Sequence, residues 1–505
     1  MKEQNSFSQF FTLSQEIAHL NSSLALLSWD QEIFMPKGSA PVRCKQLGAL
    51  AEVIHDKKTS KTYEKYLDKL VDLTTGKIKL KNLDPLQTAA IREWYKDYLH
   101  SKKLPTSFVR SFSELCSEAT EVWTLARKNN DFSLFCPFLE KIIDFSRKKS
   151  ELLGYKESPY DAHLEIFEPG MTAKKLTELF SSLKKDLKSL LNKISAKGEV
   201  DASLLYQKLG REKQLLLGNT LLKALPTDNT YMRMDESTHP FSLALHPKDV
   251  RITTRIAEKD FISNLFSILH ECGHAFYEQG LPSAYFGSPL CEAASVGIHE
   301  SQSRFWETRI GRSRAFWEFF YPEVQKVFPE FASYPLENFY TVLHKVAPSY
   351  IRVESDELTY CLHIILRFEL EKELLEKKLE PKDLPEAWKE KSLSLLGIAP
   401  TNHQEGCLQD VHWSSGLIGY FPTYALGNLY AAQIFEVFEK NHLDWEPKVM
   451  SGEFAFIKEW LKKQVHEKGR LYPPLELVEK ISEKKFSTKP FLTYLHKKYG
   501  EIYAF

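Results

Sequence analysis

The segment His270-Glu271-Cys272-Gly273-His274 holds three side chains whose types and spacing suit metal-dependent hydrolysis. On a helix, residues i and i+4 share one face about one turn apart, so both imidazoles can bind one ion. Glu271 lies roughly 100° round the helix axis from His270, where it can reach a water molecule at the metal. The alternative, two core histidines with satisfied hydrogen bonds, must bury all three groups without an ion. The pattern therefore favours a zinc hydrolase with Glu271 as general base.

The third metal ligand is less well defined by the sequence. A catalytic zinc ion takes three protein ligands and keeps its fourth position for water. No histidine follows at the spacing H-E-x-x-H-x-x-G-x-x-H, so a glutamate from the next helical segment, residues 291–311, is the expected ligand. Glu292, Glu300 and Glu307 all lie in that segment, and their spacing alone does not separate them.

The elements that position these groups are predicted to be helices. Apolar residues recur at intervals of three and four from about Ile256 to Glu278, and Gly280 is the expected terminator. The same period appears in residues 108–128 and 176–197. These patterns predict a mainly α-helical protein.

One stretch has the pattern of strands instead. From Thr238 to Ile256, a turn of His-Pro-Lys-Asp separates the β-compatible runs SLAL and VRITT. We expect a small antiparallel sheet there, near the active site. No internal repeat or low-complexity linker divides the chain, which favours a single large catalytic domain over residues 1–505, either as one body or as two lobes flanking a cleft.

The composition of the chain indicates which classes of partner and which cellular compartment to expect. The chain has 505 residues, with 67 Lys+Arg against 67 Asp+Glu, so its formal net charge is zero. Nucleic acids and anionic membranes usually meet a basic excess, and we expect neither as a partner. Its 7 cysteines include no C-x-x-C pair, which argues against a disulfide scaffold or a cysteine-bound zinc ion. Without a signal-peptide pattern or an uncharged apolar run near ~18 residues, the cytoplasm is the expected location.

Further motifs follow in order along the chain. They are His239-Pro240-Phe241, Asp249-Val250-Arg251-Ile252-Thr253, His299-Glu300-Ser301-Gln302, Ile351-Arg352-Val353-Glu354-Ser355-Asp356 and Gly406-Cys407-Leu408-Gln409-Asp410-Val411-His412-Trp413. With HECGH they resemble the thermostable metallocarboxypeptidases of the HEXXH type, whose motifs are HPF, DxRxT, HESQ, IRxxAD and GxxQDxHW. Earlier segments, SWDQEIFMPKG and SPYDAHLEIFEPGMT, also look like this family, so the resemblance covers nearly the whole chain. Ser355 departs from it, standing where the family has Ala.

The resemblance implies more than the spacing does. It carries Glu300 over as the third metal ligand, and it implies broad-specificity release of single residues from peptide C-termini. It also implies a mostly helical fold with a deep cleft and a homodimer. We expect one zinc ion per protomer, with cobalt able to substitute, and substrates with a free C-terminus.

An oxyanion donor is needed for the developing negative charge, and Tyr420 and His239 are the candidates. Tyr420 and Tyr424 lie in the segment GLIGYFPTYALGNL, where a proline and several glycines shape the backbone. A phenol that stays protonated at neutral pH is a suitable donor. The alternatives are an aromatic cluster that packs the core, for the tyrosines, and a turn cap, for His239.

Recognition of a terminal carboxylate points to Arg352, because a guanidinium binds carboxylate through two hydrogen bonds and keeps its charge. The structural alternative is an ion pair with Glu354, Asp356 or Glu357.

Four further residues are assigned to substrate binding or to orienting ligands: Gln409, Asp410, His412 and Tyr424. Asp249 and Arg251 are expected to form a structural ion pair that braces the sheet. Two rival functions stay open on the residues alone: a zinc endopeptidase or oligopeptidase without a carboxylate anchor, and a catalytically silent helical binding protein.

Overall fold

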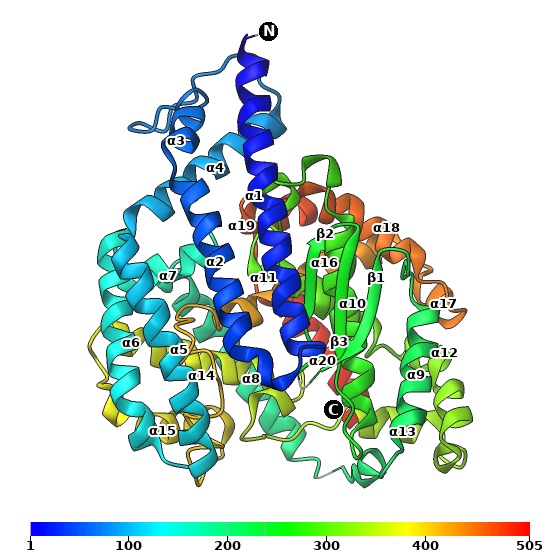
Figure 1. Cartoon of the computed structure of the whole chain (residues 1–505). Coiled ribbons are helices and arrows are strands. Elements are labelled where there is room, and N and C mark those ends of the chain that lie inside the picture. Colours follow the sequence, from blue (N-terminus) through cyan, green and yellow to red (C-terminus); the bar gives the residue numbers. More distant parts are fainter. Residues whose placement is uncertain (1, 199, 238) are drawn as a thin grey trace.

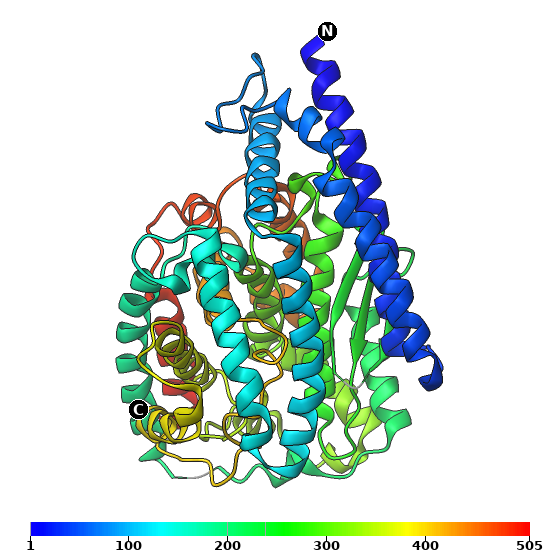
Figure 2. The same ribbon diagram turned by 60° about the vertical axis from the view of Figure 1, so that its left-hand side comes forward.

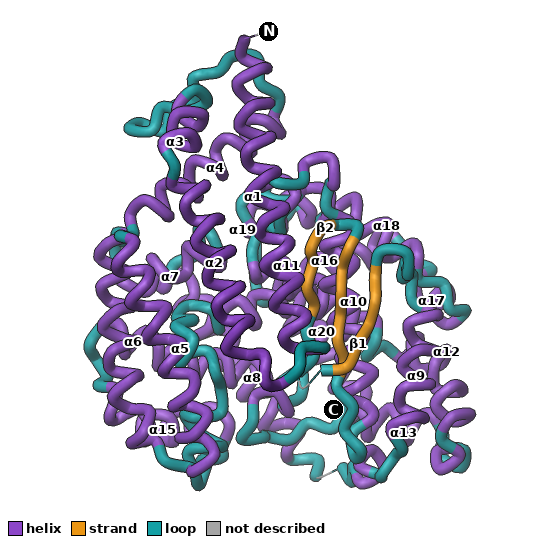
Figure 3. The backbone as a smooth tube through the Cα atoms, in the orientation of Figure 1, coloured by secondary structure: helices purple, strands orange, loops and turns teal. Residues whose placement is uncertain are grey.

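The computed structural model describes residues 2–198, 200–237 and 239–505, and helices make up most of it (Figures 1 and 3). This confirms the mainly α-helical prediction. Thr238, at the start of the expected sheet segment, lies outside the described residues. The predicted helices at 108–128 and 176–197 are found, the second ending two residues early at Ser195.

The helices before the sheet are α1 (Lys2–Ile33), α2 (Ala40–Thr59), α3 (Lys61–Asp68), α4 (Pro85–Lys103), α5 (Thr106–Asn129), α6 (Phe132–Leu153), α7 (Pro159–Phe167), α8 (Ala173–Ser195) and α9 (Arg211–Ala224). Those after it are α10 (Phe261–Gly280), α11 (Val296–Arg304), α12 (Arg314–Val327), α13 (Leu336–Leu343), α14 (Tyr360–Leu375), α15 (Leu384–Leu396), α16 (Pro422–Asn441), α17 (Trp445–Met450), α18 (Ala455–Gln464), α19 (Pro474–Ser482) and α20 (Lys489–Tyr503).

The sheet has the order β1-β3-β2, with β1 (Met232–Glu236), β2 (Ser242–His246) and β3 (Asp249–Thr254). Strands β2 and β3 pair antiparallel as expected, whereas β1 pairs parallel to β3 and makes the sheet mixed. The antiparallel prediction was therefore incomplete. The strand that was not predicted is β1, with the sequence MRMDE. Three of its five residues are charged, and no hairpin turn joins it to its partner, so it lacks the sequence pattern that indicated β2 and β3.

Helices cover both faces of this sheet (Figure 2). Helix α10 packs against β2 and β3, and α1 packs against β2 on the other side. Trp29 of α1 meets Phe241, just before β2, edge to face with ring centroids 5.3 Å apart. The sheet thus joins the amino-terminal helix to the helix that carries the HECGH motif.

Helix α10 begins at Phe261 rather than at the predicted Ile256. Strand β3 extends to Thr254, and the Asp260 carboxylate accepts a hydrogen bond from the Ser263 backbone N–H at 2.9 Å, which caps the first turn. The helix does end at Gly280. Glycine is required there by packing, because a Cβ at this position would lie 2.6 Å from the Cβ of His466.

The segment 291–311 is only partly the helix that was expected. Helix α11 starts at Val296, where the Ser295 side chain accepts from the Ile298 N–H at 3.0 Å. A π-helical turn, Phe305–Ile310, continues directly from it. The residues before Ser295, including Glu292, therefore lie outside the helix.

The apolar side chains form two buried clusters. The larger extends from α5 to α20 and includes the sheet and the faces of α10, α11 and α16. The smaller is formed mainly by α1, α3 and α4, where Phe10 and Trp94 pack with ring centroids 4.8 Å apart. Among the described residues, no helix is both long enough and apolar enough to cross a bilayer.

Candidate metal centre and active site

Helices α10 and α11 bring His270, His274 and Glu300 together. The Glu300 Oε2 lies 3.7 Å from the His270 Nε2 and 3.6 Å from the His274 Nε2. The three ligand atoms all lie within 4.8 Å of one another. Two ligand atoms about 2.1 Å from a tetrahedral zinc ion lie about 3.4 Å apart, so these separations need little change to hold one.

The other nitrogen of each imidazole is already bonded. The His270 Nδ1 lies 2.9 Å from the Glu307 Oε2, and the His274 Nδ1 lies 3.1 Å from the His299 carbonyl oxygen. Carboxylate and carbonyl oxygens only accept hydrogen bonds, so Nδ1 donates in both rings. In the neutral form of each ring, Nε2 then carries no proton and can bind a metal ion. The donor set therefore fits a divalent ion.

Glu307 is fixed from its far side by a buried arginine. The Arg304 Nη1 donates to the Glu307 Oε2 at 2.8 Å, and the Arg304 Nε donates to the Asn428 Oδ1 at 2.8 Å. Burial raises the pKa of Glu307, but the Arg304 charge and the contact with His270 together outweigh burial and lower that pKa to about 2. Glu307 thus stays ionised and orients His270.

The neighbouring glutamates have different positions. Glu271 follows His270 on α10 and is 5% exposed, and burial raises its pKa to about 7. Glu292, a candidate ligand on spacing, bonds instead to the Arg470 Nη1 at 2.9 Å. Of the three glutamates left open by the sequence, the structure brings only Glu300 to the two Nε2 atoms among the described residues.

Arg352 lies in a buried charge cluster with Asp410 and Arg367. Its Nε and Nη2 donate to the Asp410 Oδ1 at 3.1 and 3.0 Å, while the Arg367 Nε donates to the Asp410 Oδ2 at 2.7 Å. The Arg352 Nη1 also donates to the Tyr360 hydroxyl at 3.2 Å. Two guanidinium groups share one carboxylate, so the cluster keeps an excess positive charge.

The ion pairs considered for Arg352 within its own segment are not formed. Glu357 pairs with Lys498 at 2.5 Å, and the Asp356 Oδ1 accepts from the Thr359 backbone N–H at 2.9 Å. The sequence did not indicate Asp410 as the partner, because it lies 58 residues away.

Gln409 supports the Arg352 backbone. Its Oε1 accepts from the Arg352 N–H at 2.9 Å, and its Nε2 donates to the carbonyl oxygens of Tyr350 and Glu405 at 3.0 and 2.8 Å. Both ends of the amide are used in these bonds. Gln409 therefore holds the chain that presents Arg352.

His412 and the two tyrosines lie next to this cluster. The His412 Nε2 is 3.0 Å from the Tyr424 hydroxyl, and its Nδ1 is 3.9 Å from the Asp410 Oδ1. The Tyr420 ring packs edge to face on Tyr424 and on Phe167, with centroids 5.4 and 5.1 Å apart. Burial, with Glu300 contributing, raises the pKa of Tyr420 to about 12.

The sequence singled out an Asp249–Arg251 ion pair and His239 in the sheet region. Arg251 makes a bidentate ion pair with Asp249, both bonds at 3.0 Å, as expected for a pair that braces β3. His239 is exposed in the connection between β1 and β2. Within the described residues, no hydrogen bond or ring contact joins its imidazole to the metal cluster.

Tyr360 and Arg304 connect the two halves of the site. The Arg304 guanidinium lies over the Tyr360 ring, 5.0 Å from its centroid, and Tyr360 accepts from Arg352. The contacts therefore run from His270 through Glu307 and Arg304 to the Arg352 cluster. Neither residue was singled out in the sequence, although both lie within or beside the motif segments.

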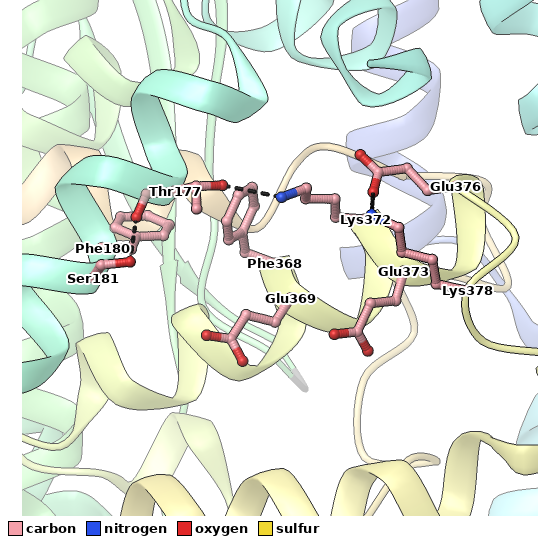
Figure 4. A pocket seen from close by; sticks show the side chains of 9 residues that line it. All are labelled: Thr177, Phe180, Ser181, Phe368, Glu369, Lys372, Glu373, Glu376 and Lys378. Atoms are coloured by element: carbon pink, nitrogen blue, oxygen red, sulfur yellow. Dashed lines mark hydrogen bonds and ion pairs between the residues drawn. The ribbon is translucent and has the colours of Figure 1, made fainter. Parts of the chain in front are cut away.

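A separate cavity of about 130 Å³ lies between α8 and α14 (Figure 4). Lys372 crosses it to donate to the Thr177 hydroxyl at 3.2 Å, and Lys378 bonds Glu376 at its edge. None of the residues that line it belongs to the metal cluster or to the Arg352 cluster.

A cluster of two imidazoles and a carboxylate, with a glutamate beside it on the same helix, defines the metallopeptidase class. The chain belongs to the carboxypeptidase Taq (M32) metallopeptidase family, whose model matches residues 9–499. It is therefore a metallocarboxypeptidase, as the resemblance of its motifs indicated.

Relatives match over the full length. Thermostable carboxypeptidase 1 of Thermus thermophilus is 41% identical over 516 residues, covering 100% of both chains. Carboxypeptidase 1 of Bacillus subtilis is 38% identical and covers 98% of each. The crystal structure of the M32 carboxypeptidase from Deinococcus radiodurans R1 superposes with a TM-score of 0.95 at 36% identity, covering 99% of this chain and 100% of that one.

Proposed function

We propose that this metallocarboxypeptidase uses one zinc ion per protomer, held by His270, His274 and Glu300, with cobalt able to replace it. The supporting observation is that both Nε2 atoms face one carboxylate oxygen while both Nδ1 atoms donate elsewhere. Nitrogen and carboxylate ligands of this kind suit zinc. When bound, zinc supplies the Lewis acidity that makes water a nucleophile at neutral pH.

Glu271 is the proposed general base. It accepts the proton of the attacking water and returns it to the leaving amine nitrogen. Tyr420 is the proposed oxyanion donor, because its phenol keeps its proton at neutral pH. Burial and the charge of Glu300, a proposed metal ligand, both raise the pKa of Tyr420. His239, the other candidate donor, is exposed in this conformation, so the proposal favours Tyr420.

Arg352 is the proposed anchor for the terminal carboxylate of the peptide. A guanidinium has five N–H groups, and three of those of Arg352 are used by Asp410 and Tyr360, which leaves two for a carboxylate. The second arginine, Arg367, gives the cluster the positive charge that this ligand needs. His412 and Tyr424 line this end of the site, while Gln409 and Asp410 hold Arg352 in place.

Comparing a peptide with a free C-terminus and its C-terminal amide tests this anchor. With Arg352→Ala, we expect kcat/KM for the free acid to fall about 100-fold or more, since two charge-assisted hydrogen bonds are lost. Inhibition by a dipeptide with a free carboxylate should weaken in parallel, while the dipeptide amide should be unaffected. Equal losses for acid and amide would show that Arg352 has only a structural role.

We further propose broad specificity for the released residue, a single catalytic domain over the whole chain, a homodimer and a cytoplasmic location. The family and its full-length relatives support the activity. The dimer rests on the family resemblance and is tested by sedimentation of the purified protein. A monomer at micromolar concentration would contradict it.

A further inference from the structure

The helix that carries Glu300 packs between α10 and α16, with a glycine at each contact. A Cβ on Gly273 of α10 would lie 2.6 Å from both the Gln302 carbonyl oxygen and the Ser303 Cα. A Cβ on Gly427 of α16 would lie 2.7 Å from the Cβ of Glu300. Real Cβ atoms essentially never approach other atoms within 3.0 Å, so both positions accept only hydrogen.

Asn428, the residue after Gly427, belongs to the chain of contacts that leads to His270. The Asn428 Oδ1 accepts from the Arg304 Nε at 2.8 Å, and the Asn428 Nδ2 donates to the Tyr424 carbonyl oxygen at 3.2 Å. Arg304 in turn holds Glu307, which accepts from the His270 Nδ1. One turn of α16 therefore contacts Glu300 directly and reaches His270 through two buried side chains.

We propose that Gly427 and Asn428 are positioning residues that fix where Glu300 and His270 present their ligand atoms. This inference rests on the proposed ligand set. Non-bonded carbon atoms normally lie about 3.5–4.0 Å apart, so a methyl group at Gly427 must displace Glu300 by about 1 Å. Metal and catalytic groups tolerate displacements of only about 0.5 Å. Helix α16 is buried along this stretch, which leaves its backbone little room to move instead.

The zinc dissociation constant is the decisive measurement, obtained by competition with a chromophoric chelator. We expect Gly427→Ala to bind zinc about 10- to 100-fold more weakly, the usual effect of disturbing the residues behind metal ligands. Wild-type affinity in a folded Gly427→Ala protein would overturn the role of Gly427.

Asn428→Ala tests the second contact without adding bulk, and it decides the proposal if Gly427→Ala does not fold by circular dichroism and gel filtration. We expect it to weaken zinc binding less than Gly427→Ala does, but measurably, because Arg304 and Glu307 remain. Zinc affinity within twofold of wild type would overturn the role of Asn428.

Two controls separate positioning from loss of stability. Gly48→Ala adds a methyl group on α2 where no atom lies within 4 Å, and it should leave zinc affinity unchanged. Ala432→Gly removes a buried methyl group from α16 and destabilises the helix without touching Glu300. If Ala432→Gly weakens zinc binding as much as Gly427→Ala does, loosening of α16 explains the effect and the proposal fails.

Glu300→Gln distinguishes failure of this inference from failure of the proposed function. If Glu300→Gln keeps wild-type zinc affinity, the ligand set itself is wrong. If Glu300→Gln loses zinc while Gly427→Ala and Asn428→Ala keep it, only the positioning role is refuted.

Discussion

Replacing Asp410 by Asn removes the only carboxylate that links Arg352 and Arg367 by ion pairs in the described structure. The side chains of the three residues are 10%, 8% and 0% exposed, respectively, so solvent screens their charges little. Asn keeps the shape of Asp but leaves two buried guanidinium groups without a counter-charge. Breaking a buried ion pair in this way costs about 3–5 kcal/mol. We expect Asp410→Asn to lose about that much unfolding free energy at pH 7.

The pH dependence of this loss gives a sharper test. Burial raises the pKa of Asp410, but the Arg367 and Arg352 charges outweigh it and hold that pKa well below its usual value. A carboxyl group with a depressed pKa stabilises the fold at all pH values above its unfolded pKa of about 4. That contribution is lost as the pH falls toward the folded pKa. The stability gap between wild type and Asp410→Asn should therefore be constant from pH 8 to 5 and shrink below about pH 4.

Urea unfolding followed by circular dichroism measures the gap, and peptide assays follow Arg352 at the same time. We expect kcat/KM for free-acid peptides to fall with Asp410→Asn, because Arg352 loses the partner that orients it. Asp444→Asn, which breaks an exposed pair with Lys448, is the matched control and should change neither quantity. Equal unfolding midpoints for wild type and Asp410→Asn at pH 7 would refute the assigned role of this cluster.

The other predictions concern the metal, the base and one buried carboxyl group. Glu271→Gln should keep full zinc content by metal analysis but lose most turnover, since the ligands remain while the base is gone; wild-type kcat would contradict its role. Glu300→Ala should lose zinc while Glu292→Ala keeps it, and the reverse result would move the third ligand to Glu292. Burial raises the pKa of Glu371 from 4.5 to about 7. Its stabilising contribution is thus present below pH 4.5 and lost as the pH rises through 7, a difference of about 3 kcal/mol. Glu371→Gln should remove that slope from the stability curve; an unchanged slope would mean that folding does not raise the pKa of Glu371.

Much of the fold could be predicted because its signals are local. The helical period of residues 108–128 and 176–197 reflects one apolar face per helix, and the structure confirms both. The hairpin of β2 and β3 was recognisable from its turn. Strand β1 was missed because its pairing with β3 is parallel and non-local. The start of α10 was misplaced because apolar residues continue into the loop before its cap.

The candidate site divides in the same way. The placing of His270 and His274 was predictable because one helix carries both. The competition among Glu292, Glu300 and Glu307 needed either the family resemblance or the structure, since all three lie on one segment. Family resemblance also selected Arg352, but its partner Asp410 comes from a loop 58 residues away and carries no local mark.

By itself, the sequence determined that two imidazoles share one helix face with a glutamate beside them, because spacing along one helix fixes relative direction. Its motifs also indicated the family. Tertiary packing alone decided how near Glu300 lies to those imidazoles, which acid neutralises Arg352, and how closely α10, α11 and α16 approach. Those distances depend on side chains that fill space between helices distant in the chain. The need for glycine at position 427 cannot be recognised in the sequence, because it depends on how closely the neighbouring helix packs.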